Sequence, residues 1–174
     1  MTASIALSSP KERITEKQYV ELKEVVNSKH NPITYLAVDP GKSNGVCTYN
    51  SDYQLMAMLT IRSDDINFFI HQFEHIITCV VENFSLFPNK AKEQVYSDME
   101  TSRVIGRLES WAEIKKIQLV KQSPTIKPTA YLWLGKKPLP KSNPRNHLMD
   151  AHAHFTYWAV KTGRIKGETL LKGI

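Results

Sequence analysis

The sequence predicts an α/β fold, a five-stranded mixed sheet flanked by helices in the order β-β-β-α-β-α-β-α. Two observations lead to this prediction. Short runs rich in β-branched and aromatic residues are typical of strands, and segments with apolar residues at helical spacing separate the later runs. Because the chain has no internal repeat, we expect one main domain, residues 32–174, after an N-terminal extension, residues 1–31.

The first half of the chain is expected to form a helix and then a three-stranded meander. Residues 14–27 have helical spacing that ends at Asn31-Pro32, since a residue before proline disfavours helical backbone. The three strands are expected at residues 33–39 (ITYLAVD), 45–50 and 53–61, the last two joined by the turn-forming sequence Asn50-Ser51-Asp52.

Helices and strands are expected to alternate in the second half. An amphipathic helix should begin at Asp64 and Asp65, because acidic residues favour the first turn of a helix. On the long helix that follows the fourth strand, Ser102, Gly106 and Ser110 recur at a spacing of four, which indicates close packing against the sheet or a neighbouring helix. The expected elements are a helix at 66–77, a strand at 78–84, a helix from Asn89 to about Lys116, a strand at 117–120, an irregular proline-rich segment at 122–146 and a helix at 147–160.

The stretch LAVDPGKSNG, residues 36–45, contains a "GKS" that suggests a phosphate-binding loop. Such a loop requires G-x-x-x-x-G-K-[ST] leading into a helix, but its first glycine position is Leu36, and Asn44-Gly45 leads into a strand. Lys42 is therefore expected to be an exposed turn residue, with a phosphate contact as the alternative. The informative residue is Asp39, a carboxylate at the end of a buried strand, where it is costly unless something pairs with it.

Three other residues are candidates for the same site. Glu82 also ends a hydrophobic strand, and His147 and Asp150 lie three residues apart, on one face at the start of the last helix. Carboxylate and imidazole groups without a matching cysteine pattern suit hard divalent ions such as Mg²⁺ or Mn²⁺. Two such ions about 3.5–4 Å apart support phosphodiester hydrolysis.

The motifs VDPG on the first strand, VVENF on the fourth and HLMDA on the last helix, with SRVIGRLESWA between them, resemble the RuvC-type Holliday-junction resolvases of the ribonuclease H-like superfamily. The resemblance covers about residues 33–163. It implies a ribonuclease H-like fold and a homodimeric endonuclease for four-way or other branched DNA. It also implies that Asp39 bridges two metal ions, Glu82 holds one, and Asp150 with His147 holds the other.

The resemblance extends to candidate DNA contacts. Phe84 corresponds in position to an aromatic residue that these resolvases insert into the junction, and a core or loop aromatic is the alternative. Lys136 and Lys137 are expected to contact phosphates, and Arg103 and Arg107 to do the same or to be solvated. His154, one turn after Asp150, is either a partner of that carboxylate or a packed core histidine.

Charge and composition agree with a polyanionic partner. The net charge is +6, and residues 121–149 contain six basic residues and no acidic ones, which accounts for the whole excess. No apolar run reaches the length of a membrane span, and Cys47 and Cys79 lie in apolar runs typical of buried, reduced thiols. We therefore expect a cytoplasmic protein of a bacterial or phage-infected cell, with no membrane partner and no small-molecule cofactor.

Other functions fit parts of the same pattern. A ribonuclease H-like nuclease acting on an RNA–DNA hybrid, or on a transposition or packaging intermediate, would use the same carboxylates. A catalytically silent junction-binding module would keep the fold. An actin-like ATP-binding domain also begins with Asp-x-Gly before a meander, but that class needs a duplicated domain, and 174 residues hold one.

Overall fold

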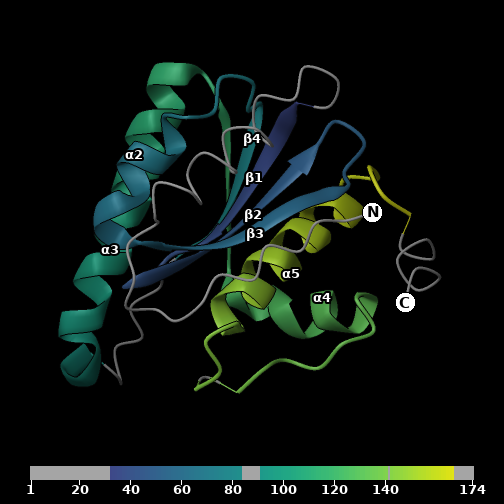
Figure 1. The fold of residues 1–174 in the computed structure, drawn as a ribbon. Helices are drawn as coiled ribbons and strands as arrows, with labels where there is room; N and C mark the ends of the chain where they lie inside the picture. The colour runs from purple at the N-terminus through teal and green to yellow at the C-terminus, as the bar shows by residue number, and fades with distance from the viewer. Residues whose placement is uncertain (1–31, 84–90, 141, 167–174) are drawn as a thin grey trace.

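A computed structural model describes residues 32–83, 91–140 and 142–166 of the chain, and for residues 91–98 it describes the backbone alone. The N-terminal extension with its expected helix lies outside the described residues. Figure 1 shows a central sheet with helices on both sides. No helix in the described part of the chain combines the length and apolarity that crossing a membrane would require.

The sheet has five strands in the order β3-β2-β1-β4-β5. The pairs β1–β2 and β2–β3 are antiparallel, whereas β1–β4 and β4–β5 are parallel, so the predicted mixed sheet is confirmed. The central strand β1 is covered on both faces, which explains its nearly continuous apolar sequence. The strands are β1 Ile33–Asp39, β2 Ser43–Asn50, β3 Leu55–Arg62, β4 Thr78–Glu82 and β5 Gln118–Gln122.

Side chains on the strands alternate between two cores, one on each face of the sheet. Leu36 and Val38 of β1 belong to the larger core, which is closed by α2 (Ile66–Ile70) and α3 (Ala91–Lys115). Ala37 belongs to the second core, under α5 (Asn146–Lys161). Because side chains two residues apart lie on one face of a strand, Asp39 is on the α5 side of the sheet.

The predicted helix over residues 66–77 is too long. A 3₁₀ turn at Ser63–Asp65 leads into α2, which ends at Ile70. Phe73 and Ile76, beyond that end, are nevertheless buried in the larger core. The apolar spacing therefore indicated burial correctly, but the chain leaves the helix early. Ile77, the residue before β4, already donates its N–H to Thr34 O of β1.

The segment at 122–146, expected to be irregular, contains a helix. After a 3₁₀ turn at Pro124–Ile126, α4 spans Lys127–Trp133 and packs against α5. The segment is rich in proline, but Pro124 is the first residue of the 3₁₀ turn and Pro128 the second residue of α4, where a missing N–H costs nothing. The Ser123 hydroxyl accepts the Thr125 N–H and caps the first turn.

The ridge of small residues on α3 does not press against the sheet. Val104 and Leu108 face the larger core, whereas Ser102, Gly106 and Ser110 are exposed. A Cβ added at Gly106 would have no atom within 4 Å among the described residues. The spacing-four pattern therefore marks the solvent side of this helix within the chain.

Candidate metal centre

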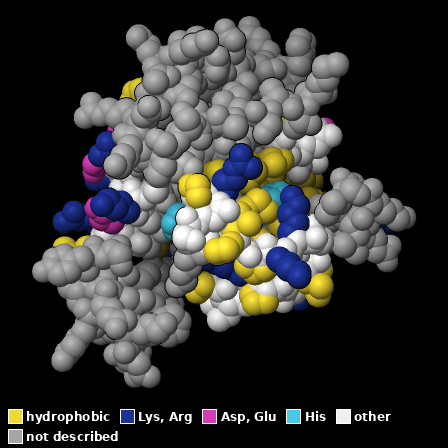
Figure 2. Space-filling model, turned by 60° about the horizontal axis from the view of Figure 1, so that its bottom comes forward, with side chains coloured by type: hydrophobic (Ala, Val, Ile, Leu, Met, Phe, Trp, Pro, Cys, Tyr) yellow, Lys and Arg dark blue, Asp and Glu magenta, His cyan; other side chains and the backbone are white. Residues whose placement is uncertain are grey.

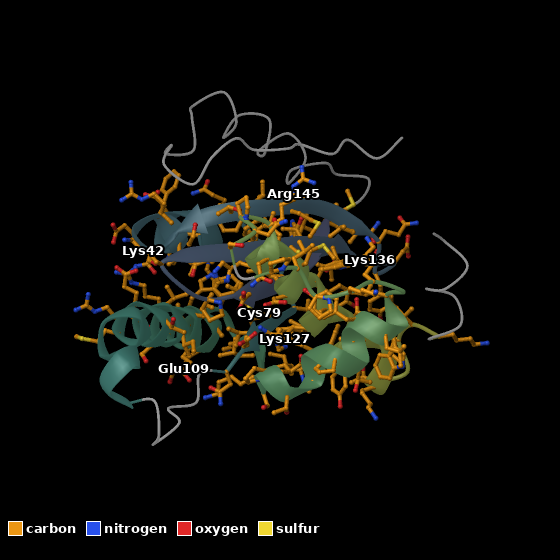
Figure 3. The ribbon with its side chains drawn as sticks, turned by 90° about the horizontal axis from the view of Figure 1, so that it is seen from below. Lys42, Cys79, Glu109, Lys127, Lys136 and Arg145 are labelled. Carbon is orange, nitrogen blue, oxygen red and sulfur yellow. The ribbon has the colours of Figure 1, made fainter. Side chains whose placement is uncertain are left out.

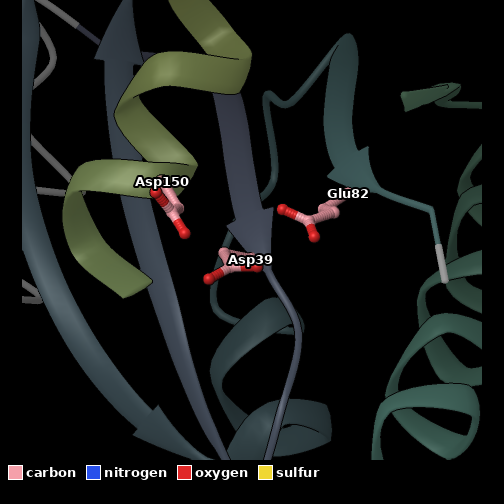
Figure 4. A group of neighbouring side chains, drawn as sticks. All are labelled: Asp39, Glu82 and Asp150. Atoms are coloured by element: carbon pink, nitrogen blue, oxygen red, sulfur yellow. The ribbon is translucent and has the colours of Figure 1, made fainter. Parts of the chain in front are cut away.

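Strand ends and one helix bring three carboxylates together. Asp39 and Glu82 are the last residues of the adjacent parallel strands β1 and β4, and the carboxyl ends of such strands form the usual ligand-binding edge of an open α/β sheet. Asp150 faces them from the second turn of α5. One oxygen from each residue lies within 4.8 Å of the others, as Figure 4 illustrates. The three predicted carboxylates are therefore neighbours.

His147, the fourth predicted residue, lies beside Asp39. Its Nδ1 is 2.6 Å from Asp39 Oδ2, and its side chain is half-exposed while that of Asp39 is buried. This hydrogen bond raises the pKa of His147, with the Asp39 charge adding to it. Burial raises the pKa of Asp39, and the neighbouring Glu82 charge adds to this effect against the opposing His147 hydrogen bond. The imidazole thus orients the Asp39 carboxyl.

A lysine from α4 lies between two of the carboxylates. Lys127 Nζ is 2.6 Å from Glu82 Oε2 and 2.7 Å from Asp150 Oδ2. Burial favours the neutral amine, but the charges of Asp39 and Glu82 outweigh it and raise the pKa of Lys127. In Figure 3 Lys127 lies near the middle of the molecule, whereas Lys42, Lys136 and Arg145 lie toward its edges.

Sequence reasoning counted Lys127 as one member of a basic segment and did not place it in the site. The only signal was the excess of basic residues between 121 and 149. To recognise its role, one would have had to predict α4. Lys127 is the first residue of that helix, and its side chain points toward Asp150.

His154 contacts Glu82 rather than Asp150. Its Nε2 is 2.8 Å from Glu82 Oε2, and its Nδ1 is 2.9 Å from Gln122 Oε1, while the residue itself is fully buried. Burial would raise the pKa of Glu82, but the His154 hydrogen bond and the Lys127 charge together lower it below its usual value. Of the two alternatives for His154, the contact with Asp150 is thus wrong, whereas the buried position agrees with a packed histidine. Gln122 was not recognised from the sequence.

Asp150 has its own set of donors. The buried Tyr131 hydroxyl donates to Asp150 Oδ1 at 2.7 Å, and Asn146 Nδ2 lies 3.4 Å from Oδ2. Burial raises the pKa of Tyr131, and its hydrogen bond to Asp150 adds to this, so the phenol stays a donor. Tyr131 belongs to the same unrecognised helix as Lys127. Each of the three carboxylates thus has a neutral or basic partner that fixes its orientation.

The donor set fits a hard divalent cation. Mg²⁺ and Mn²⁺ prefer carboxylate oxygens, and three such groups converge here at a largely buried position. Asp39, Glu82 and Asp150 would be its protein ligands. The ammonium of Lys127 shows that this position already attracts positive charge.

Close packing of β2 against α5 sets the position of the helix. Gly45 pairs with Asp39 across β1 and β2, and a Cβ at residue 45 would overlap the carbonyl group of His147 and lie 2.6 Å from the Leu148 nitrogen. Gly45 therefore does more than follow a turn: it lies inside β2, within the strand expected at 45–50, and permits a close approach. The strand at this position agrees with the rejection of a phosphate-binding loop.

The turn between β1 and β2 is held by the buried side chain of Asn44. Its Oδ1 accepts the Gly41 N–H at 3.0 Å, and its Nδ2 donates to Ile61 O at 2.9 Å. Lys42 projects from this turn and is exposed. Lys42 is thus free to contact a phosphate, the alternative suggested for it, because it lies three residues after the carboxyl end of β1.

The other predicted DNA contacts fall in different places. Lys136 and Lys137 are exposed beyond the end of α4, and Arg103 is exposed on α3. Arg107 is half-buried, and its Nη1 donates to Ser63 O at 2.6 Å, so this guanidinium ties α3 to the 3₁₀ turn before α2. Phe84 lies outside the described residues.

The sheet order, the mixed strand directions and the helices on both faces define a ribonuclease H-like fold of the RuvC type. RuvC of Thermus thermophilus, solved in complex with a Holliday junction substrate, superposes with a TM-score of 0.52 at 13% identity, over 75% of this chain and 96% of that one. The yeast mitochondrial Holliday junction resolvase Ydc2 gives 0.52 at 11% identity, over 92% of each chain. The predicted resemblance in fold is thus confirmed.

No model of a protein family matches this sequence, and no curated protein matches it at a significant level.

Proposed function

We propose that this protein is a divalent-metal-dependent nuclease that cuts four-way or other branched DNA. The observation that carries the proposal is the convergence of Asp39, Glu82 and Asp150, whose oxygens lie within 4.8 Å of one another at the carboxyl edge of the sheet. The likeness in fold to two Holliday-junction resolvases supports the choice of substrate. The same likeness favours a nuclease over an ATP-binding domain.

We propose that the site holds two Mg²⁺ or Mn²⁺ ions. When bound, they would supply an activated water and stabilise the leaving oxygen of the phosphodiester. The residues of the chain contribute orientation. His147 holds Oδ2 of Asp39, Tyr131 holds Oδ1 of Asp150, and both strand-borne carboxylates stand on rigid, hydrogen-bonded strand ends. The half-exposed imidazole of His147 stands at the rim of the site, where it can meet substrate or water.

Exposed basic residues in the segment 121–149 support a polyanionic substrate. Of the basic residues between 121 and 149, Lys121 pairs with Glu109 and Lys127 turns inward, whereas Lys136, Lys137 and Arg145 are exposed and form no ion pair within the described part of the chain. Figure 2 shows Lys and Arg side chains scattered among hydrophobic ones on the face turned forward. Such charges would bind phosphates and make affinity fall with salt.

The proposal includes a homodimer. Resolving a four-way junction requires cuts in two opposed strands, and a single cluster of three potential metal ligands occurs among the residues that the structure describes. Two copies related by a twofold axis would supply two such sites. Light scattering of the purified protein, alone and with a four-way junction, measures this stoichiometry.

The test uses an end-labelled four-way junction with Mg²⁺, beside linear duplex, fork and RNA–DNA hybrid controls. We expect paired symmetric nicks confined to the junction. Asp39→Asn and Glu82→Gln should abolish cutting and leave junction binding largely intact, because each removes a charge without removing a side chain. Undiminished cutting by either variant would contradict the proposed site, and preferential cutting of the hybrid would assign the same site to a different substrate.

A further inference from the structure

The buried His154 and the half-buried Gln122 form a bridge behind the acidic cluster. Glu82 and Gln122 are register partners at the ends of the parallel strands β4 and β5, so their side chains lie on the same face of the sheet. His154 descends onto both from α5, four residues after Asp150, and contacts Glu82 with one ring nitrogen and Gln122 with the other. One imidazole therefore ties two strand ends to the helix that carries Asp150.

We propose that His154, anchored by Gln122, is a positioning residue that sets the orientation of Glu82 for cation binding. This inference rests on the proposed metal site. Two donors, His154 Nε2 at 2.8 Å and Lys127 Nζ at 2.6 Å, share Oε2 of Glu82. If a divalent cation displaced the ammonium, the hydrogen bond from His154 would remain on Oε2 and hold the Glu82 carboxylate in place.

The geometry favours positioning over simple core packing. A buried histidine needs polar partners whatever its role. His154, which is 0% exposed, takes one of its two partners from the acidic cluster itself, since its Nε2 contacts Glu82. Glu82 is the ligand with the most freedom, because it has one more rotatable bond than an aspartate. Hydrogen bonds behind metal ligands commonly change metal affinity about 10–100-fold when they are lost.

Two substitutions separate the two contacts of the imidazole. In His154→Gln the amide nitrogen can occupy the place of Nε2 and keep the hydrogen bond to Glu82. In His154→Asn the shorter amide reaches the place of Nδ1 and keeps only the contact with Gln122. Gln122→Leu removes the anchor at a half-buried strand end, where the protein tolerates the change more readily. His152→Gln on the same helix is the control, since His152 bonds Tyr49 rather than the cluster.

The experiment measures Mn²⁺ binding by titration calorimetry, without DNA, for the full chain and each variant. We expect the dissociation constant to rise about tenfold or more in His154→Asn, several-fold in Gln122→Leu, and less than about threefold in His154→Gln and His152→Gln. On a cleavable junction, His154→Asn should lower kcat and leave KM nearly unchanged.

The outcomes separate this inference from the proposed function. Mn²⁺ binding by the wild type with equal affinity in Gln122→Leu and His154→Asn would overturn the positioning role and leave the metal site standing. If His154→Asn does not fold, an unchanged dissociation constant in Gln122→Leu overturns the role by itself. A wild-type protein that binds no Mn²⁺ would overturn the proposed metal site and, with it, this inference.

Discussion

Gly45 of β2 lies directly against the backbone of His147 at the start of α5, so close that any Cβ on residue 45 would overlap the His147 carbonyl group. The obstacle is backbone rather than a flexible side chain, so the helix or the strand must shift. We therefore expect Gly45→Ala to cost about 3 kcal/mol of unfolding free energy and to weaken Mn²⁺ binding, because Asp150 moves with the helix. Urea unfolding and Mn²⁺ titration measure the two effects.

The matched control for this change is Gly106→Ala. Gly106 lies within the exposed face of α3, and a Cβ there meets no described atom within 4 Å. An alanine in the interior of a helix is favoured over glycine by about 0.5–1 kcal/mol, so this variant should be slightly more stable than the wild type. A Gly45→Ala protein of wild-type stability would contradict the close packing of β2 against α5.

Lys127→Met should make the protein less stable without metal and more responsive to it. The substitution leaves Glu82 and Asp150 without their shared counter-charge, which we expect to cost about 3 kcal/mol in EDTA. Because no ammonium then competes with the cation, the rise in Tm on adding Mn²⁺ should exceed that of the wild type. Thermal unfolding in EDTA and in Mn²⁺ measures both.

Lys121→Met provides the comparison. Lys121 also forms an ion pair, with Glu109, but both side chains are nearly half-exposed. Exposed pairs contribute little, so this variant should lie within about 1 kcal/mol of the wild type and respond to Mn²⁺ in the same way. Equal behaviour of the two lysine variants would show that Lys127 does not interact with the carboxylates as described.

Tyr131→Phe removes the buried hydroxyl that donates to Asp150. A hydrogen bond to a charged group contributes about 1.5–3 kcal/mol, and we expect a loss of that order in urea unfolding. Combining the change with Asp150→Asn should give a coupling of about 1 kcal/mol in a double-mutant cycle, since the two side chains act as one unit. The control is Tyr157→Phe, which should be nearly neutral because the ring of Tyr157 still stacks on Trp133. Zero coupling between the changes at Tyr131 and Asp150 would refute their hydrogen bond.

The two thiols should be inert in the folded protein. Burial raises the pKa of Cys79 to about 12 and that of Cys47 still further above its ordinary value. The thiolate is the reactive form, so at pH 8 a thiol reagent such as Ellman's reagent should modify neither residue in buffer and both in guanidinium. A fast-reacting thiol in the native protein would mean that one of the two cores opens readily.

Local patterns in the sequence determined most of the fold. The strand at residues 33–39 and the long helix ending near Lys116 were predicted because apolar periodicity and strand-forming residues act within a few positions of each other. The same logic identified Asp39 and Glu82, because a carboxylate that ends a buried strand is costly unless it has a partner. The helix α4 was not predicted, because its segment is rich in proline. Proline is tolerated at the start of a helix and disfavoured in its interior, and the sequence alone does not show which position a proline takes.

Only the tertiary structure decided how the site is assembled. The bond between His154 and Glu82 joins residues 72 apart in the sequence, and Lys127 enters the site because α4 packs against α5 with its first residue facing inward. The sequence places Gly45 in a strand but does not show that its missing side chain lets α5 approach β2. Such relations arise where separate elements meet in space. Hydrophobic periodicity encodes which face of each element is buried, whereas the distances between their polar groups depend on how those faces pack together.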